Sequence, residues 1–157
     1  DIEATLPALK EFTGLPYRCQ WLGNKEGVTF YNDSKGTNVG ATLAAVEGLG
    51  TEVKGKIWLL LGGVGKEQDF SPLADVCRKY VAEVQVYGAA CKEIITDING
   101  SCETYAHETL DEAFKRSHLL AKEGDVILFS PACASFDQFK DYIARGAHFT
   151  SLVEAIL

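Results

Sequence analysis

Short apolar segments alternate with segments of helical periodicity along most of this chain, and this pattern limits it to few folds. The run Lys56–Leu61 is almost entirely apolar, as in strands that are buried on both faces of a parallel sheet. Val84–Tyr87 and Asp125–Phe129 are expected to be further strands, with helical segments between them. Strands that alternate with helices imply right-handed crossovers and a mostly parallel sheet.

An amino-terminal hairpin adds one antiparallel strand to this expectation. Arg18–Leu22 and Val28–Asn32 flank a polar stretch over residues 23–27, which predicts a hairpin with a longer loop. Cys102–Tyr105 is a candidate for a further short strand. Together these segments predict a three-layer α/β/α, Rossmann-like domain of about six strands, mostly parallel with one antiparallel strand from the hairpin.

Glycine, proline and capping residues predict where the helices begin and end. The first expected helix is Val39–Glu47, with Gly48 and Gly50 at its end, and the second has Pro72 as its first residue and Ser71 as its cap. A third is expected at Ala89–Ile98, and a fourth opens with a capping box from Thr109 to Glu112 and ends at Gly124. The last is expected from about Asp137 to the end of the chain, with an interruption near Gly146.

The composition is that of one ordinary globular domain, and we expect residues 1–157 to form it. The 157 residues are 46% hydrophobic and 24% charged. The net charge of −7 argues against nucleic acid or an anionic membrane as a general partner, because both favour basic surfaces. No apolar run approaches the roughly 20 residues that span a bilayer, so no membrane insertion is expected.

The five cysteines are odd in number and widely spaced, with no Cys-x-x-Cys motif and no spacing typical of zinc sites. Reduced thiols are therefore expected, which favours the cytoplasm. The chain starts at Asp1 without methionine and opens with a partly apolar helical stretch, Ile2–Phe12. We expect it to be part of a longer protein, with residues 1–15 as a helical lead-in from a preceding domain.

Three polar or glycine-rich loops are expected at the edge where the carboxyl ends of the strands meet. They cover residues 32–38 (NDSKGTN), 62–66 (GGVGK) and 130–135 (SPACAS). In an open α/β sheet such loops converge at one edge, where ligands bind. Asp33, Lys35 and Lys66 bring charge to this edge, which predicts a site for a charged small molecule.

The glycine-rich loop is not a Walker phosphate loop, because Leu60 and Glu67 stand where that motif needs glycine and a hydroxyl residue. A turn that only lets strand and helix pack is an open interpretation, and Lys66 is a candidate anchor for a carboxylate or phosphate. Ser135 is expected at or near the N-cap of the next helix, whose free N–H groups can bind an anion. Cys133 is expected to be a small packed thiol and not a nucleophile.

The three loops resemble those of Mur ligases, and in particular of the members that add D-glutamate in peptidoglycan synthesis. The matching segments are residues 32–38, 59–66 and 130–139. The NDSK segment at 32–35 is shared more loosely across Mur ligases, whereas SPACAS with DQF at 137–139 is more specific to the D-glutamate-adding members. The resemblance covers nearly the whole chain, from about Leu15 onward.

The resemblance implies the C-terminal domain of a three-domain, ATP-dependent ligase, expected to be a monomer. The other domains would bind UDP-N-acetylmuramoyl-L-alanine and carry the ATP phosphate loop with its Mg²⁺ ligands. The reaction makes an acyl phosphate, which the amine of D-glutamate attacks to leave ADP and phosphate. Because this chain has no Walker sequence, it is expected to be inactive alone and to hold neither ATP nor Mg²⁺ tightly.

The same resemblance implies a D-glutamate pocket. Lys66 and Thr37 would hold the side-chain carboxylate, and Ser135 with the backbone of Phe136 would hold the α-carboxylate. Tyr142 would line the pocket. Phe136 and Tyr142 stand where this group of ligases commonly has leucine and phenylalanine, which affects the shape of the pocket more than its function.

The resemblance also implies that Arg18 and Asp33 reach ATP, and that Lys35, a candidate catalytic residue, lies near the reacting groups. No residue of this chain is expected to bind a metal. From the residues alone, two other function classes stay open: a Rossmann-like nucleotide-binding oxidoreductase domain and a stand-alone noncatalytic binding module. The first is weakened because no Gly-x-Gly-x-x-Gly follows the first parallel strand.

Overall fold

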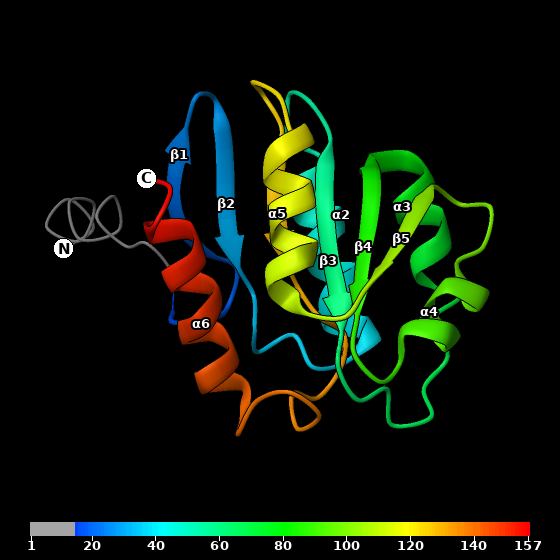
Figure 1. Ribbon diagram of the computed structural model, residues 1–157. Helices are drawn as coiled ribbons and strands as arrows, with labels where there is room; N and C mark the ends of the chain where they lie inside the picture. The colour runs from blue at the N-terminus through cyan, green and yellow to red at the C-terminus, as the bar shows by residue number, and fades with distance from the viewer. Residues whose placement is uncertain (1–14) are drawn as a thin grey trace, which may run out of the picture.

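A six-stranded sheet in the order β1-β2-β6-β3-β4-β5 forms the centre of the domain in the computed structural model, which describes residues 15–157 (Figure 1). The strands are β1 (Gln20–Lys25), β2 (Val28–Asn32), β3 (Ile57–Gly62), β4 (Val81–Tyr87), β5 (Glu103–His107) and β6 (Val126–Phe129). β1 is antiparallel to β2, and the other neighbours are parallel. This confirms the predicted sheet. The helix expected at Ile2–Phe12 lies outside the described residues.

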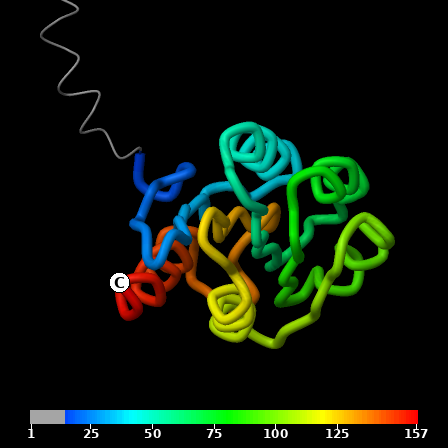
Figure 2. The backbone as a smooth tube through the Cα atoms, turned by 90° about the horizontal axis from the view of Figure 1, so that it is seen from above, coloured from blue at the N-terminus to red at the C-terminus, as the bar shows by residue number. Residues whose placement is uncertain are grey.

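Helices cover both faces of the sheet, which confirms the three-layer architecture (Figure 2). The helices are α2 (Val39–Gly50), α3 (Leu73–Tyr80), α4 (Cys91–Asp97), α5 (Leu110–Leu120) and α6 (Tyr142–Glu154). α2, α3 and α4 pack on one face, and α5 and α6 pack on the other. None of the helices among residues 15–157 combines the length and the hydrophobicity that a membrane span requires.

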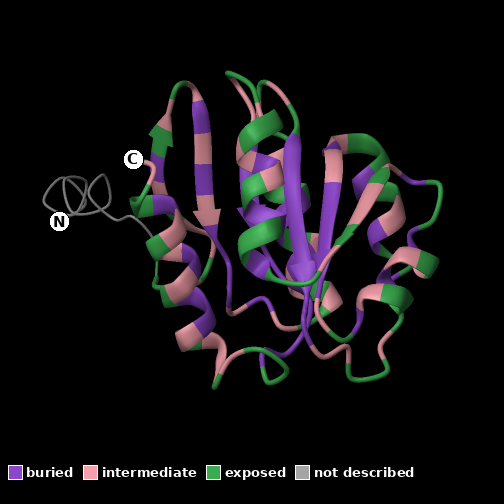
Figure 3. Ribbon diagram, in the orientation of Figure 1, coloured by how far each residue is buried: buried purple, intermediate pink, exposed green. Residues whose placement is uncertain are grey.

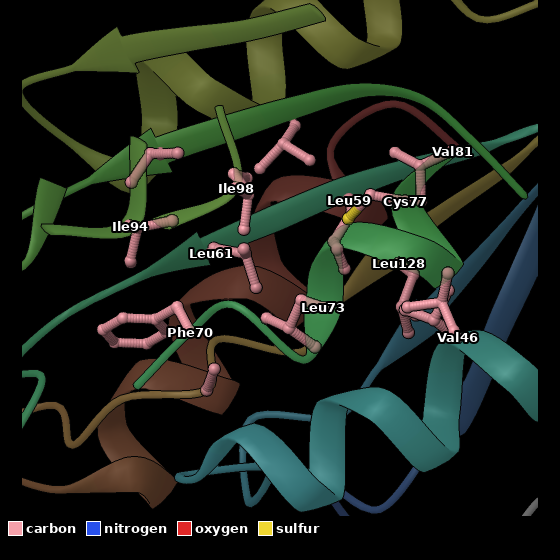
Figure 4. Close-up of a cluster of buried hydrophobic side chains, with 14 of the residues drawn as sticks. Val46, Leu59, Leu61, Phe70, Leu73, Cys77, Val81, Ile94, Ile98 and Leu128 are labelled. Carbon is pink, nitrogen blue, oxygen red and sulfur yellow. The ribbon is translucent and has the colours of Figure 1, made fainter. Parts of the chain in front are cut away.

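The central strand β3 explains why its sequence is apolar without alternation. Ile57, Leu59 and Leu61 pack in one hydrophobic cluster with α2, α3 and α4, which Figure 4 shows in part. Trp58 and Leu60 pack in the second cluster with α5 and α6. All five are buried, and the strands at the centre of the sheet are the most buried part of the domain (Figure 3). Each such side chain contributes about 1.5–3 kcal/mol of burial free energy.

The hairpin is tighter than predicted. β1 continues to Lys25, so only Glu26 and Gly27 connect it to β2, with φ angles of 52° and 84°. Two consecutive positive φ angles match the twist of the flanking strands and make a two-residue turn favourable. The longer loop expected over residues 23–27 is therefore wrong.

Several helix ends differ from the prediction. α2 continues through Gly48 to Gly50, because a helix interior tolerates an exposed glycine at a cost of about 1 kcal/mol. α3 begins at Leu73, and Pro72 holds the N-cap position without a side-chain hydrogen bond, so Ser71 is not its cap. The Ser71 N–H instead donates to the carboxylate of Asp69 at 2.9 Å.

The predicted cap of α5 is confirmed in its first half. The Thr109 hydroxyl accepts from the Glu112 N–H, but the Glu112 carboxylate accepts from the N–H of Glu108 and not of Thr109. α5 ends at Leu120, four residues before Gly124. β4 begins earlier than expected, β5 is shifted towards its carboxyl end, and α4 is shorter than expected at both ends.

α6 begins later than predicted and is not interrupted. The chain makes turns over residues 136–141 before Asp141 caps the helix by accepting from the Ala144 N–H. Gly146 is buried inside α6, and a Cβ there would lie 2.3 Å from the ring of Tyr17. Glycine at this position thus permits a close contact between α6 and the segment before β1, and does not end the helix.

Candidate functional site

Three loops leave the carboxyl ends of three neighbouring strands, β2, β6 and β3, and lie together at one edge of the sheet. We call them the β2–α2 loop (residues 33–38), the β3–α3 loop (residues 63–72) and the β6–α6 loop (residues 130–141). In Figure 1 they occupy the lower edge of the domain. The convergence predicted from the sequence is therefore observed.

Backbone hydrogen bonds hold the three loops to one another. Val64 and Ala134 exchange both of their backbone bonds, at 2.8 and 3.0 Å, which makes a small antiparallel bridge between the β3–α3 and β6–α6 loops. Ala132 N–H donates to Gly36 O at 2.8 Å and joins the β6–α6 loop to the β2–α2 loop. The β6–α6 loop therefore lies between the other two and fixes their spacing.

Lys66 connects the outer two loops. Its ammonium donates to the backbone oxygen of Thr37 at 3.0 Å, and its side chain is exposed at the edge. Lys66 and Glu67 both have left-handed backbone conformations, with φ angles of 55° and 56°. Non-glycine residues rarely adopt this region, and such strain concentrates at functional sites. The loop thus presents the lysine in a specific, costly backbone conformation.

Ser135 lies in the β6–α6 loop but does not cap a helix. The backbone oxygen of Ser135 accepts from Phe139 N–H in a single turn, and Asp141 caps α6 six residues later. The predicted helix N-terminus at Ser135 is therefore wrong. In the described part of the chain, neither the Ser135 hydroxyl nor the Phe136 N–H has a hydrogen-bond partner, so both can serve a ligand. The Phe136 side chain is 73% exposed.

Lys35 and Tyr142 lie against each other. The Lys35 ammonium donates to the Tyr142 hydroxyl at 3.2 Å and lies 4.3 Å from the centre of its ring. The Tyr142 ring also meets Tyr17 edge-on, with ring centres 6.4 Å apart. Cation–π contact and the hydrogen bond together restrain the lysine at the side of the β2–α2 loop.

Arg18, Asp33 and Lys35 line one depression of about 320 Å³ next to α2. The Asp33 carboxylate accepts from the Ser130 hydroxyl at 2.6 Å and from the Cys19 N–H at 3.0 Å. Burial raises the pKa of Asp33 above its usual value, although these hydrogen bonds and Arg18 act in the opposite direction. The depression therefore combines an exposed cation with a carboxylate whose orientation is fixed.

A buried arginine that the sequence analysis did not identify lies beneath the site. The guanidinium of Arg145, from α6, donates to the hydroxyl and backbone oxygen of Ser34 at 3.1 and 2.7 Å, and to Cys133 O at 2.9 Å. It is fully buried, and burial lowers its pKa, yet arginine stays charged at such sites. No local pattern marked it, because an arginine inside a helix usually faces solvent.

Cys133 is a packed thiol at this edge, as predicted. It is fully buried, and burial raises its pKa to about 12, so it carries no thiolate at neutral pH. Among residues 15–157, no group of three histidine, cysteine or acidic side chains is placed to hold a metal ion.

Comparison with known proteins agrees with this geometry. A family profile described as Mur ligase, glutamate ligase domain, matches residues 17–133 of this chain. The chain belongs to this Mur ligase family. UDP-N-acetylmuramoylalanine–D-glutamate ligase of Coxiella burnetii is 46% identical over 155 residues, which are 99% of this chain and 35% of that protein. The ligase of the same name from Pseudomonas aeruginosa is 45% identical, over 98% of this chain and 34% of that protein. The chain thus spans about a third of the length of these relatives.

Solved structures share the fold at low sequence identity. The MurF ligase of Thermotoga maritima in complex with ADP has a TM-score of 0.64 at 18% identity, over 99% of this chain and 37% of that one. A bifunctional folylpolyglutamate synthase/dihydrofolate synthase of Yersinia pestis, complexed with AMPPNP and Mn ion, has a TM-score of 0.64 at 16% identity, over 90% of this chain and 32% of that one. These likenesses support the Mur ligase fold alone.

The Mur ligase site residues expected from the sequence fall into two groups. Lys66 and Thr37 are joined directly, and Ser135 belongs to the loop bridged to that of Lys66. Arg18 and Asp33 share the depression beside α2 with Lys35, against which Tyr142 packs.

Proposed function

We propose that this chain is the C-terminal, amino-acid-binding domain of an ATP-dependent ligase that joins D-glutamate to UDP-N-acetylmuramoyl-L-alanine. The observation that carries the proposal is the convergence of Lys66, Thr37 and Ser135 at one edge, in a chain 46% identical to ligases named for that product. A cation, a hydroxyl and a free backbone N–H near one another suit an amino acid with two carboxylates. A cytoplasmic, monomeric enzyme is part of the proposal.

Lys66 and Thr37 would bind the side-chain carboxylate of D-glutamate. The Lys66 ammonium has three donors, of which one is used on Thr37 O in the described structure. The Ser135 hydroxyl and the Phe136 N–H, which have no partner among the described residues, would bind the α-carboxylate. When both carboxylates are fixed, the amine is oriented for its attack on the acyl phosphate, and the smaller entropy cost of that attack raises the rate.

Arg18 and Asp33 would contact ATP, and Lys35 would lie near the reacting groups. Their shared depression supports this assignment, since a cation there suits a phosphate and a carboxylate suits a ribose hydroxyl. Tyr142 holds Lys35 by its hydroxyl and ring, so we assign its main effect to that lysine. ATP and Mg²⁺ would be bound mainly by other parts of the full-length ligase, and this chain alone would release no phosphate from ATP.

The test is Lys66→Ala in the full-length ligase, with steady-state kinetics in each substrate. The KM for D-glutamate should rise by tenfold or more, because the charge-assisted hydrogen bond is worth about 1.5–3 kcal/mol. The KM for ATP should stay within twofold. Lys92→Ala is the matched control, because Lys92 is an exposed lysine in α4. Equal increases of both KM values in Lys66→Ala would contradict the assigned role.

A further inference from the structure

The carboxamide of Gln68, in the β3–α3 loop, joins that loop to the β6–α6 loop and to the first residue of α2, directly after the β2–α2 loop. Its Oε1 accepts from the N–H of Val39, at the first turn of α2, at 2.9 Å. Its Nε2 donates to Gly65 O at 2.8 Å and to Ala132 O at 2.7 Å. Both N–H groups and the oxygen of this side chain are therefore hydrogen-bonded to backbone groups, which belong to three separate segments.

Each of those backbone groups lies close in sequence to a proposed ligand of D-glutamate. Val39 follows Thr37 by two residues, Gly65 directly precedes Lys66, and Ala132 precedes Ser135 by three residues. We propose that Gln68 is a positioning residue that fixes the relative places of Thr37, Lys66 and Ser135, and so sets the affinity for D-glutamate. This inference rests on the proposed function and deepens it.

The backbone around Gln68 shows why such support is needed. Lys66 and Glu67, the two residues before it, are held in left-handed conformations that are strained for residues other than glycine. Gly62, the last residue of β3, and Gly63, the first of the loop, have φ angles of 145° and 128°, which glycine reaches readily, so they restrain the loop little. Gln68 is the side chain that joins this strained segment to both neighbouring loops.

A simple structural role for Gln68 would predict a loss of stability alone. Its bonds reach only the loops at this edge, and the strands are held by their own ladders and by the two hydrophobic clusters. Loss of the carboxamide should therefore disturb the pocket while the domain stays folded. The effect should appear in D-glutamate binding and not in ATP binding, because Gln68 is not among the residues that line the depression with Arg18 and Asp33.

The experiment compares Gln68→Glu and Gln68→Met in the full-length ligase by steady-state kinetics. Gln68→Glu keeps the shape but sets a carboxylate oxygen against two carbonyl oxygens, and Gln68→Met keeps the length without any hydrogen bond. Both should raise the KM for D-glutamate by about tenfold or more, with Gln68→Glu the stronger. The KM for ATP and the kcat at saturating D-glutamate should change by less than threefold.

Gln85→Met is the matched control, because the Gln85 carboxamide is hydrogen-bonded to Glu83 of β4 at 2.8 Å and to His107 of β5 at 2.7 Å, and not to the three loops of the site. It should leave the KM for D-glutamate within twofold, and melting temperatures should show that all variants are folded. Gln68→Asn, which keeps the carboxamide on a shorter side chain, replaces either variant that does not fold.

Lys66→Ala measured in parallel separates the two proposals. If Lys66→Ala raises the KM for D-glutamate and neither Gln68 variant does, the positioning role is wrong and the pocket stands. Equal increases of the ATP and D-glutamate KM values in the Gln68 variants would also overturn it. If Lys66→Ala itself leaves the KM for D-glutamate unchanged, the pocket and the role of Gln68 are both wrong.

Discussion

Arg145 should be among the most costly polar residues to remove from this domain. Its guanidinium makes three hydrogen bonds, to Ser34 Oγ, Ser34 O and Cys133 O, from a fully buried position. Arg145→Met would leave two backbone oxygens without this donor, at about 1–3 kcal/mol for each buried unsatisfied group, and would remove a third hydrogen bond worth about 1 kcal/mol to the Ser34 hydroxyl, which still donates to Tyr142 O. We expect the free energy of unfolding to fall by at least about 3 kcal/mol, a large share of the 5–15 kcal/mol typical of a domain.

Urea unfolding of the 157-residue chain measures this change in the free energy of unfolding, and thermal unfolding measures the melting temperature. At about 2–4 °C per kcal/mol for a domain of this size, the melting temperature should fall by at least about 6 °C. Arg78→Met is the control, because Arg78 is an exposed arginine whose ion pair with Asp75 is worth less than about 1 kcal/mol. If Arg145→Met were within 1 kcal/mol of Arg78→Met, the buried network would not be what holds these loops together.

Three further predictions follow from the same structure. Gly63→Ala should destabilise the domain by about 1–3 kcal/mol, because the added Cβ would lie 2.1 Å from Ala134 O. Gly48→Ala should stabilise it by about 0.5–1 kcal/mol, because a Cβ at that position of α2 would meet no other atom. Urea unfolding of both variants measures the two changes in the free energy of unfolding. Burial raises the pKa of Asp33 above its usual 3.8, so the folded chain holds this proton more tightly than the unfolded chain does. The free energy of unfolding of the wild type should therefore fall relative to that of Asp33→Asn as the pH rises from 3.8 through the folded-state pKa. Coincident curves of unfolding free energy against pH for the two proteins would contradict this. Iodoacetamide should label Cys102 before Cys133, because the neighbouring Cys77 thiol and the Ser101 hydroxyl lower the pKa of Cys102, whereas burial raises the pKa of Cys133; peptide mass spectrometry reports the order.

The parts of the fold that sequence predicted well depend on burial over several residues. The nearly continuous apolar run Lys56–Leu61 predicted a strand covered on both faces, and β3 (Ile57–Gly62) is one. The convergence of the three loops followed from parallel connectivity, which places the carboxyl ends of strands at one edge. Lys66 is a candidate anchor because it follows a glycine-rich turn beside two other polar loops, and its role as a ligand of D-glutamate stays a prediction.

The parts that sequence could not give depend on contacts between distant residues. Gly146 suggested a break in a helix, but it permits contact with Tyr17, which is far away in the chain. Ser135 suggested a cap, yet Asp141 caps α6, and both residue types are equally good caps. Arg145 and Gln68 gave no local signal, because their partners lie in other loops and only the folded chain brings them together.

The most direct test of the proposed pocket is a crystal structure of the full-length ligase with D-glutamate and ADP. In that structure we expect one D-glutamate with its side-chain carboxylate on Lys66 and its α-carboxylate on the Ser135 hydroxyl and the Phe136 N–H. A D-glutamate bound elsewhere, or one that contacts only one of Lys66 and Ser135, would contradict it.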